Sequence, residues 1–508
     1  MRTRILIKLA LAAIVVLVLA RSGLAAPEKM SAIASSPTLP RHPRDLHYTP
    51  LKFERPHPTR AVLSNGMVIY MLENHELPLV SAQFVIRTGR LYEPEDKVGL
   101  AQLVGTVLRT GGTTNRTGDA IDKRLEFLSA SVQTHISTQE GEASLNCLSK
   151  DFDEILALLA DILRHPRFAG NKILLAKMQM LEGIRRQNDS PNSILSREFS
   201  KLLYVSSLAW ARTPTYETVM RVSRKDLIAF HRQYFHPNNI IAGFAGDFKS
   251  VELLKRLEHL FGNWPRTDVK SPTIAPLADR NEPSLNYVYK DIPQSYFEFG
   301  HLGIRRNNPD WHAVHVMNHI LGLGGFTSRL MSEIRSNRGL AYSVGAQLTE
   351  DTDRGRFSAW CQTKSESTQE AISTMLDIIR RMATDPISDN EMEKAKSAIR
   401  DGFVFRFETP RKVIDEQIRL EYYGYPLDYL DTYTDKIMAV TKADVQRVAK
   451  KYIHSDQIVI LVVGDKSCFG KPLDDLGSLR EIKLPKPVEP RLPWWKFLFG
   501  PSLWRMAR

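Results

Sequence analysis

The sequence predicts an α+β protein built from two duplicated domains. The first observation is an internal repeat, in which residues 222–247 and 440–465 align without a gap at an offset of 218 residues. The second is that each copy reads as an amphipathic helix leading into a short, continuously apolar strand. Two copies at this long period indicate a duplicated domain, because a solenoid needs shorter repeats and at least three of them. The pairs identical in the two copies are Val222/Val440, Asp226/Asp444, Tyr234/Tyr452, His236/His454, Ile240/Ile458, Gly246/Gly464 and Asp247/Asp465.

Local signals mark the start of the helix in both copies. Ser223 and Thr441 are candidate N-cap residues, and each is followed three positions later by an aspartate that complements the positive end of a helix. The alternative, two unrelated helix–strand units, is disfavoured by the ungapped register.

Residues 1–25 are predicted to be an export signal. Basic residues precede an apolar run over residues 9–20, and Gly23 and Ala25 fit the small-residue rule for cleavage after Ala25. The run is shorter than the roughly 20 residues that a membrane span needs, although an uncleaved anchor is the alternative. We therefore expect the protein in the periplasm or cell envelope of a bacterium.

The composition is that of a globular protein, with 43% hydrophobic and 25% charged residues. The formal net charge of +12 is spread along the chain without a long basic run, which argues against nucleic-acid binding. The three cysteines, Cys147, Cys361 and Cys468, are far apart and odd in number. They predict buried free thiols and at most one disulfide, and they do not have a zinc-ribbon spacing.

The chain divides into six predicted segments. A signal peptide (1–25) and a flexible lead-in (26–54) precede a first domain (55–265), a Pro-rich linker (266–284), a second domain (285–475) and a tail (476–508). Within the domains, Asn65-Gly66 marks a hairpin over residues 60–73. Helices are predicted at 99–108, 118–129, 152–163, 171–188, 311–321, 328–335, 367–383 and 389–405.

The tail carries three of the seven tryptophans, Trp494, Trp495 and Trp504, interleaved with lysine and arginine. Amphipathic rings beside cations suit a membrane interface, so shallow peripheral membrane contact is one interpretation. Packing of the tryptophans onto the protein body is the alternative.

Several motifs in order give the chain a family resemblance. The segment Gly99–Thr106 followed by Gly112-Thr113, the segment Gly322–Leu330, the segment Arg338–Tyr342 and the repeat itself resemble the pitrilysin/insulinase zinc peptidases. These are inverzincins, and the similar branch contains bacterial and mitochondrial-processing-type members. The resemblance covers about residues 55 to 470. It implies that each domain is a mainly antiparallel sheet packed with helices and that the two domains form half of a clam-shell chamber.

The residues needed for zinc chemistry are missing from the matching positions. Active members carry H-x-x-E-H on a helix and a second glutamate further along, which supply three zinc ligands and a general base. The matching residues here are Gln102, Gly105, Thr106 and Gly183, and no H-x-x-E-H occurs in the 508 residues. Glu182 is adjacent to the last position, but one carboxylate makes no metal site. We therefore expect no catalytic residue, metal ligand or cofactor in this chain.

The matching residues of the second half are present. By the resemblance, Arg335 and Tyr342 bind the substrate backbone and polarise the scissile carbonyl, since a guanidinium and a phenol both donate hydrogen bonds. A glycine-rich loop would let a peptide backbone approach closely. The predicted substrate-binding residues of this loop are Gly322, Gly324, Gly325 and Phe326. The structural alternative is a surface arginine, a core tyrosine and a plain turn between helices.

A second candidate cluster is His312, His315 and His319, which share one helical stripe. The outer two are two turns apart, about 10 Å along the axis, which is too far for one zinc ion. We expect these histidines to flank the core in solvent or at an interface.

Three functions follow, in order of preference. The first is a non-catalytic subunit that contributes peptide binding and carbonyl polarisation to a zinc-bearing paralogous subunit, so that the zinc belongs to the partner. The second is a stand-alone protein of the cell envelope that binds peptides or unfolded polypeptides without cleaving them. The third is a peptidase with a novel site. A neighbouring gene for an intact H-x-x-E-H homologue would separate the first from the second.

Overall fold

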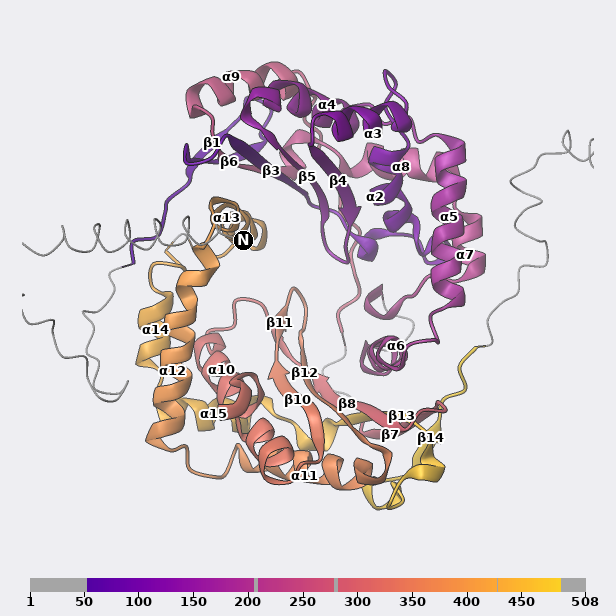
Figure 1. Ribbon diagram of the computed structural model, residues 1–508, viewed down its shortest axis with the longest axis vertical. Coiled ribbons are helices and arrows are strands. Elements are labelled where there is room, and N and C mark those ends of the chain that lie inside the picture. The colour runs from indigo at the N-terminus through magenta and orange to yellow at the C-terminus, as the bar shows by residue number, and fades with distance from the viewer. Residues whose placement is uncertain (1–52, 205–208, 278–281, 427, 486–508) are drawn as a thin grey trace, which may run out of the picture. The chain divides into compact units, whose positions relative to one another are not determined.

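The structure, a computed structural model, describes residues 53–204, 209–277, 282–426 and 428–485 (Figure 1). In these residues two six-stranded sheets carry one copy of the repeat each. The strand order is β1-β2-β6-β3-β5-β4 in the first and β10-β12-β8-β13-β7-β14 in the second. When the second order is read backwards, the repeat strands β6 and β13 take the same place in their sheets. The predicted α+β fold of two duplicated domains is confirmed.

The strands of the first sheet are β1 (Thr59–Val62), β2 (Val68–Glu73), β3 (Leu79–Ile86), β4 (Ser131–Ile136), β5 (Gly141–Leu148) and β6 (Ile240–Gly246). Its half of the chain contains the helices α2 (Leu100–Thr110), α3 (Gly118–Phe127), α4 (Phe152–Arg164), α5 (Gly170–Arg185), α6 (Pro191–Tyr204), α7 (Tyr216–Arg221), α8 (Arg224–Tyr234) and α9 (Ser250–Phe261).

The second half contains β7 (Ser284–Tyr289), β8 (Gln294–Leu302), β9 (Ile304–Arg305), β10 (Ala341–Leu348), β11 (Glu350–Asp351), β12 (Arg356–Lys364), β13 (Val459–Gly464) and β14 (Leu479–Glu481). Its helices are α10 (Trp311–Asn318), α11 (Thr368–Arg381), α12 (Asp389–Phe403), α13 (Pro410–Tyr423), α14 (Tyr433–Ala439) and α15 (Lys442–Tyr452). A small parallel pair, β9 with β11, lies outside the main sheets.

Both main sheets are mainly antiparallel, with parallel pairing where a strand returns after several helices. In the first sheet β2 and β6 are parallel, and in the second β13 and β14 each lie parallel to β7. A parallel neighbour requires a long crossover, and the helices between β2 and β6 supply it.

The predicted helix starts of the repeat are confirmed. At the start of α8 the Asp226 carboxylate accepts a hydrogen bond from the Ser223 backbone N–H at 2.7 Å, while the Ser223 hydroxyl accepts one from the Asp226 N–H. Thr441 and Asp444 make the same reciprocal pair at the start of α15. Such a capping box satisfies two backbone donors that the first turn of a helix leaves free.

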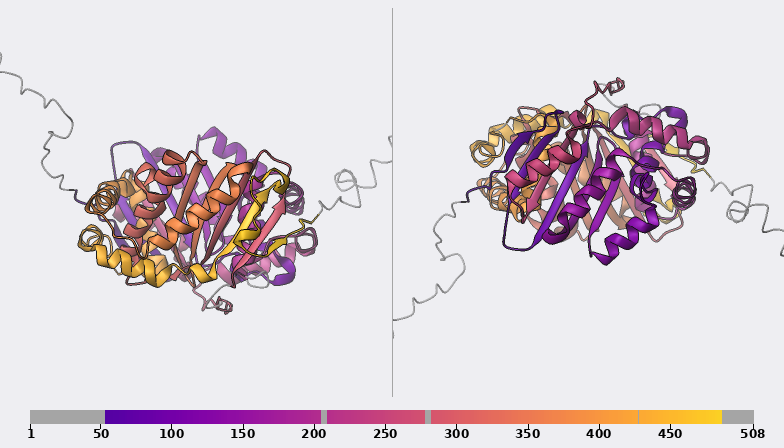
Figure 2. Two further views of the ribbon diagram at one scale, coloured as in Figure 1. Left: turned by 90° about the horizontal axis from the view of Figure 1, so that it is seen from below. Right: turned by 90° about the horizontal axis from the view of Figure 1, so that it is seen from above.

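One face of each sheet is covered by helices of its own half. Residues of α4 and α9 pack with the first sheet in one apolar core, and residues of α11 pack with the second. In Figure 2 these helices lie in front of the strands, α11 in the view from below and α4 with α9 in the view from above.

The opposite face of each sheet is covered by a helix from the other half. Helix α13 packs on β2, β3 and β6 of the first sheet, and α6 packs on β8 and β13 of the second (Figure 1). Ile414 and Ile418 of α13 join Val85 and Ile241 in one apolar cluster. The equivalent cluster under α6 contains Ile194, Leu195, Phe199, Leu203, Val288, Leu302, Val459, Leu461 and Val463. The two halves therefore exchange one helix each.

The exchange explains why the repeat strands are apolar without alternation. Both faces of a strand buried in this way read as apolar, and every residue of β13 is buried. In β6, Gly243 allows the close approach of α13, because a Cβ there would lie 2.3 Å from Cγ2 of Ile414.

The cysteines agree in part with the prediction of buried free thiols. Cys147, Cys361 and Cys468 are free thiols, and the first two are buried as predicted, whereas Cys468 is exposed. No helix in the described ranges is both long and apolar enough to span a bilayer. The predicted signal peptide, most of the lead-in and the aromatic tail from residue 486 onward lie outside the described residues.

Candidate functional site

The residues that replace the zinc ligands lie around one pocket of the first half. Gln102 and Thr106 project from α2 and Gly183 lies on α5, and together they line a cavity of about 390 Å³. The other polar side chains of its wall are Gln179, Gln187, Arg197 and Thr213. Amides, hydroxyls and a guanidinium are not the thiolate, imidazole and carboxylate ligands that zinc takes in proteins. The donor set does not fit a zinc ion.

Gly105, which stands at the position of the general base, does not face this pocket. A Cβ on this residue would lie 2.5 Å from the backbone N of Ile136 and 2.8 Å from Cα of His135. The Thr134 hydroxyl on the same strand, β4, donates a hydrogen bond of 2.6 Å to the Gly105 carbonyl. Helix α2 therefore lies so close to β4 that residue 105 has no room for a side chain.

Glu182 adjoins the pocket residue Gly183 in sequence, but its carboxylate pairs with two arginines of the same helical segment. It accepts hydrogen bonds from Arg185 at 2.7 Å and from Arg186 at 2.6 Å, and these bonds lower its pKa to about 2. It does not line the pocket. Throughout the ranges that the structure describes, no three His, Cys, Asp or Glu side chains are grouped so that they could hold a metal ion.

Sequence reasoning missed Arg197, which reaches the pocket from the exchanged helix α6. Its guanidinium donates to the Gln187 carbonyl at 2.7 Å, to Asn188 Oδ1 at 2.6 Å and to the buried Glu198 carboxylate at 2.7 Å. The sequence holds no signal for this residue, because its position depends on a helix that packs on the other half's sheet.

In the second half, Arg335, Phe326 and Tyr342 form one cluster. Arg335 Cζ lies 4.5 Å from the centre of the Tyr342 ring and 4.8 Å from that of Phe326, so the guanidinium lies between two aromatic rings. The rings are 78% and 66% exposed, which places both outside the core. Arg335 belongs to a π-helical segment, Met331–Asn337, and Tyr342 to the edge strand β10. The alternative in which Tyr342 is a core residue is wrong.

The three loop glycines have different surroundings. A Cβ on Gly322 would meet the backbone of Ala346 at 2.2 Å, and one on Gly324 would meet the carbonyl of His319 at 2.6 Å. Both glycines therefore allow close packing within the protein. Gly325 has φ of +56°, and a Cβ there would meet nothing within 4 Å. Of the three, Gly325 is the one with open space beside its backbone.

The three histidines of the stripe lie on a side of α10 that packs against other helices. His312, His315 and His319 are half-buried, and burial lowers the pKa of each. The pKa of His315 falls to about 4, and its Nδ1 lies 2.6 Å from the Tyr433 hydroxyl. The predicted helix over 311–321 is α-helical only to Asn318 and continues as a π-helical turn, His319–Leu323. The histidines flank the core as predicted, but they face other helices of the same chain instead of open solvent, because α12 and α14 pack against α10.

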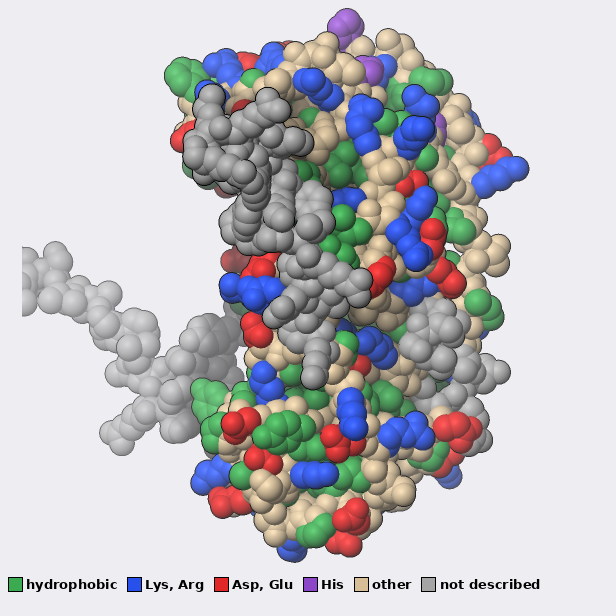
Figure 3. Space-filling view, turned by 90° about the vertical axis from the view of Figure 1, so that its right-hand side faces the viewer, with side chains coloured by type: hydrophobic (Ala, Val, Ile, Leu, Met, Phe, Trp, Pro, Cys, Tyr) green, Lys and Arg blue, Asp and Glu red, His purple; other side chains and the backbone are tan. Residues whose placement is uncertain are grey.

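One face of the molecule shows charges of both signs. On the face that carries α5 and α7, basic and acidic side chains are interspersed (Figure 3). This face therefore carries no continuous basic surface of the kind that nucleic acid binds.

Comparison with known proteins gives consistent matches. Residues 68–209 match the family described as "Insulinase (Peptidase family M16)" and residues 221–399 match "Peptidase M16 inactive domain". The chain is 26% identical over 401 residues to "Non-peptidase homolog YmxG" of Helicobacter pylori, covering 78% of this chain and 92% of that protein. It is 23% identical over 469 residues to "Probable mitochondrial-processing peptidase subunit beta" of Arabidopsis thaliana, covering 85% and 84%.

A solved structure supports the fold. The crystal structure of a "peptidase M16 inactive domain" from Pseudomonas fluorescens superposes with a TM-score of 0.74 at 24% identity, covering 80% of this chain and 98% of that one.

Proposed function

Because the chain belongs to the insulinase (M16) peptidase family as an inactive member without the zinc-binding motif, we propose that it is the non-catalytic subunit of a heteromeric zinc endopeptidase. In this proposal it contributes peptide binding and carbonyl polarisation, and a paralogous partner subunit contributes the zinc. The observation that carries the proposal is a contrast between the halves. The donors around Gln102 and Thr106 do not fit zinc, whereas Arg335 and Tyr342 lie together at the surface.

The Arg335 cluster has the chemistry that this role needs. A guanidinium and a phenol can donate hydrogen bonds to a peptide carbonyl and bind it more tightly as negative charge develops on the oxygen. The Phe326 and Tyr342 rings hold the guanidinium of Arg335 from both sides, which limits its rotamers before a substrate arrives. The exposed rings also offer apolar surface to peptide side chains.

A partner subunit and a cell-envelope location complete the proposal. The Arabidopsis relative is named as a peptidase subunit, which supports a multisubunit arrangement here. The predicted export signal supports the periplasm or cell envelope, and the aromatic tail supports peripheral contact with a membrane. Peptides or unfolded polypeptides are the proposed substrates, bound in the chamber that the two subunits enclose.

The test is co-expression with an H-x-x-E-H homologue encoded in the same genome, followed by kinetics on the purified complex. Arg335→Ala or Tyr342→Phe should lower peptide cleavage about 100- to 1000-fold, the typical loss for one transition-state donor. Assembly, followed by size-exclusion chromatography, should not change. Arg338→Ala is the matched control, because Arg338 follows Arg335 by three residues but pairs with Glu333 instead of the aromatic rings.

Wild-type turnover in both variants would refute the catalytic contribution. If no zinc-bearing homologue associates with the chain but the chain alone binds unfolded polypeptide, the second function, a stand-alone pseudo-peptidase that binds peptides, replaces the first.

A further inference from the structure

The second half contains a pocket that is the counterpart of the one around Gln102. It has a volume of about 450 Å³ and lies between α10 with its π-helical turn and helix α12. The first pocket lies between α2 and α5, and both α2 and the π-helical turn pack on the edge strands of their sheets, β4 and β10. A glycine on the second helix lines each pocket, Gly183 in the first and Gly402 in the second. Duplication has therefore left two pockets in equivalent places with different walls.

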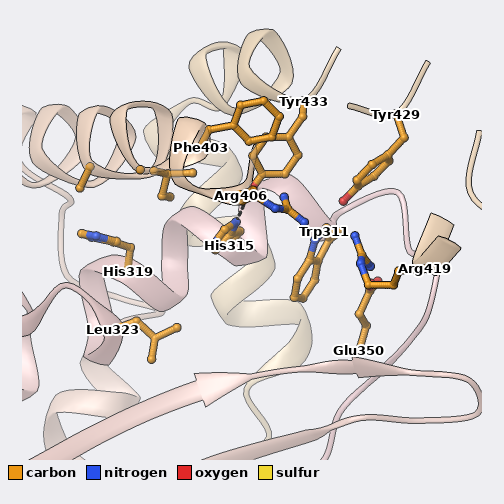
Figure 4. A pocket seen from close by; sticks show the side chains of 13 residues that line it. Trp311, His315, His319, Leu323, Glu350, Phe403, Arg406, Arg419, Tyr429 and Tyr433 are labelled. Atoms are coloured by element: carbon orange, nitrogen blue, oxygen red, sulfur yellow. Dashed lines mark hydrogen bonds between the residues drawn. The ribbon is translucent and has the colours of Figure 1, made fainter. Parts of the chain in front are cut away.

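The wall of the second pocket includes the four aromatic side chains Trp311, Phe403, Tyr429 and Tyr433. Phe403 stacks on Tyr433 with ring centres 4.9 Å apart, and Trp311 stacks on His315 at 5.9 Å (Figure 4). Tyr429, Leu323 and Ile399 complete the apolar lining. These stacked pairs hold the walls in fixed orientations, so the pocket favours a flat, rigid guest.

One end of the pocket is polar and includes an acceptor without a partner. Glu350 Oε1 accepts a hydrogen bond from the Tyr425 hydroxyl, while its Oε2 is buried and makes no hydrogen bond. Arg406 and Arg419 line the same pocket (Figure 4). Buried polar atoms in folded proteins are nearly always hydrogen-bonded, so an unpaired carboxylate oxygen in a cavity wall indicates a missing donor.

The charges at this end balance. Arg406 and Arg419 both donate to the single carboxylate of Glu416, and Glu350 supplies the second negative charge. Burial opposes the charge of Arg419, but its hydrogen bonds with Glu416 hold its pKa above the usual value. Burial also keeps His315 uncharged at neutral pH, with a pKa of about 4. A guest with a net charge gains nothing from such a balanced set.

A neutral ring that both donates and accepts a hydrogen bond matches this pocket. A phenol O–H can donate to Glu350 Oε2, and the phenol oxygen can accept from a guanidinium N–H. An indole offers only a donor and a phenyl ring offers neither. We propose that the pocket binds a phenolic ring, presented by a tyrosine of a bound peptide or by a small phenol.

The pocket is continuous with the glycine-rich loop. Leu323 lines the pocket and immediately precedes Gly324, and both Leu323 and Phe326 are exposed. A peptide lying along the loop can therefore place a tyrosine side chain in the pocket. The proposal requires no zinc-bearing partner and is independent of the catalytic role of Arg335.

The experiment is calorimetric titration of the mature chain with N-acetyl-tyrosinamide, N-acetyl-phenylalaninamide, 4-methylphenol and a tyrosine-containing decapeptide. The phenols should bind at least tenfold more tightly than the phenylalanine compound. Gly402→Leu should abolish binding by filling the pocket, because an added Cβ there meets nothing within 4 Å and the fold can accept it. Gly183→Leu is the matched control, since it is an equally open helix position in the other pocket.

Glu350→Gln provides a second, smaller change that should remove the preference for phenol over phenyl. A decapeptide that binds at least tenfold more tightly than the free phenols identifies peptide tyrosine as the source, and equal affinities identify a small phenol. The proposal is overturned if no phenol binds, if the phenylalanine compound binds equally well, or if folded Gly402→Leu protein binds as the wild type does.

Discussion

The close contact between α2 and β4 at Gly105 predicts that glycine-to-alanine changes at two helical positions, Gly105 and Gly183, will differ in their effect on stability. Gly105→Ala adds a methyl group 2.5 Å from the backbone of Ile136, where no rotamer can relieve the contact. Gly183→Ala adds the same group to the interior of α5, where it meets nothing within 4 Å.

The magnitude follows from separating two effects. Replacing a helical glycine by alanine stabilises the helix by about 1 kcal/mol in either variant, so this contribution cancels in the comparison. Overpacking against the strand costs Gly105→Ala about 1 to 3 kcal/mol. Gly183→Ala should therefore exceed the wild type in stability, and the two variants should differ by about 1 to 3 kcal/mol. Because the two halves exchange helices, about 430 residues unfold as one unit. At about 2.1 cal/mol/K of unfolding entropy per residue, the difference corresponds to about 1 to 3 °C in melting temperature.

Urea unfolding monitored by circular dichroism measures the difference in the free energy of unfolding. Thermal melting measures the difference in melting temperature. Equal stabilities for the two variants would refute the reasoning, because they would show that α2 can move away from β4 without loss. The same argument predicts that Gly105→Glu destabilises the protein further, so rebuilding the zinc motif by substitution alone should not restore a peptidase.

Three further predictions concern metal, pH and the tail. The mature chain alone should bind no stoichiometric zinc and cleave no peptide; elemental analysis showing one tightly held zinc per chain, with chelator-sensitive proteolysis, would contradict this. Burial lowers the pKa of His231 and of His301 to about 4, below the ordinary 6.5. The unfolded chain therefore takes up protons before the folded chain does. The free energy of unfolding should fall by up to about 1.4 kcal/mol per pH unit for each histidine as the pH drops from 6.5 towards 4. Urea midpoints that do not change over this range would contradict this pH dependence. Deleting residues 494–508 should move protein from the membrane to the soluble periplasmic fraction at an unchanged melting temperature, and a less stable truncation would instead assign the tail to the core.

The sequence predicts the parts of this fold that depend on local signals. The capping boxes at Ser223 and Thr441 and the apolar strands that follow them are each defined within a few residues, and their occurrence twice identifies the duplication. The loss of the zinc ligands can likewise be predicted from the residue types at Gln102 and Thr106 alone.

The features that sequence reasoning missed all depend on contacts between distant segments. An apolar stripe on α6 or α13 shows that the helix is buried but does not show which sheet buries it. The histidine stripe of α10 adjoins the core stripe, and only the placement of α12 and α14 decides that it faces a pocket. The polar end of that pocket joins Glu350, Arg406 and Arg419 from three separate elements. The proposed roles of Arg335 and Tyr342 rest on family spacing and remain predictions.

The exchange of α6 and α13 makes the order of synthesis matter to this protein. When the first half leaves the ribosome, the face of its sheet that carries Val85 and Ile241 is uncovered, because residues 410–423 have not yet followed. Helix α6 is equally without its sheet until β8 and β13 exist. Each half alone would therefore expose an apolar sheet face and an unpaired helix, which are the surfaces that chaperones bind and aggregates form from. Although the chain arose by duplication, its two halves can complete folding only together.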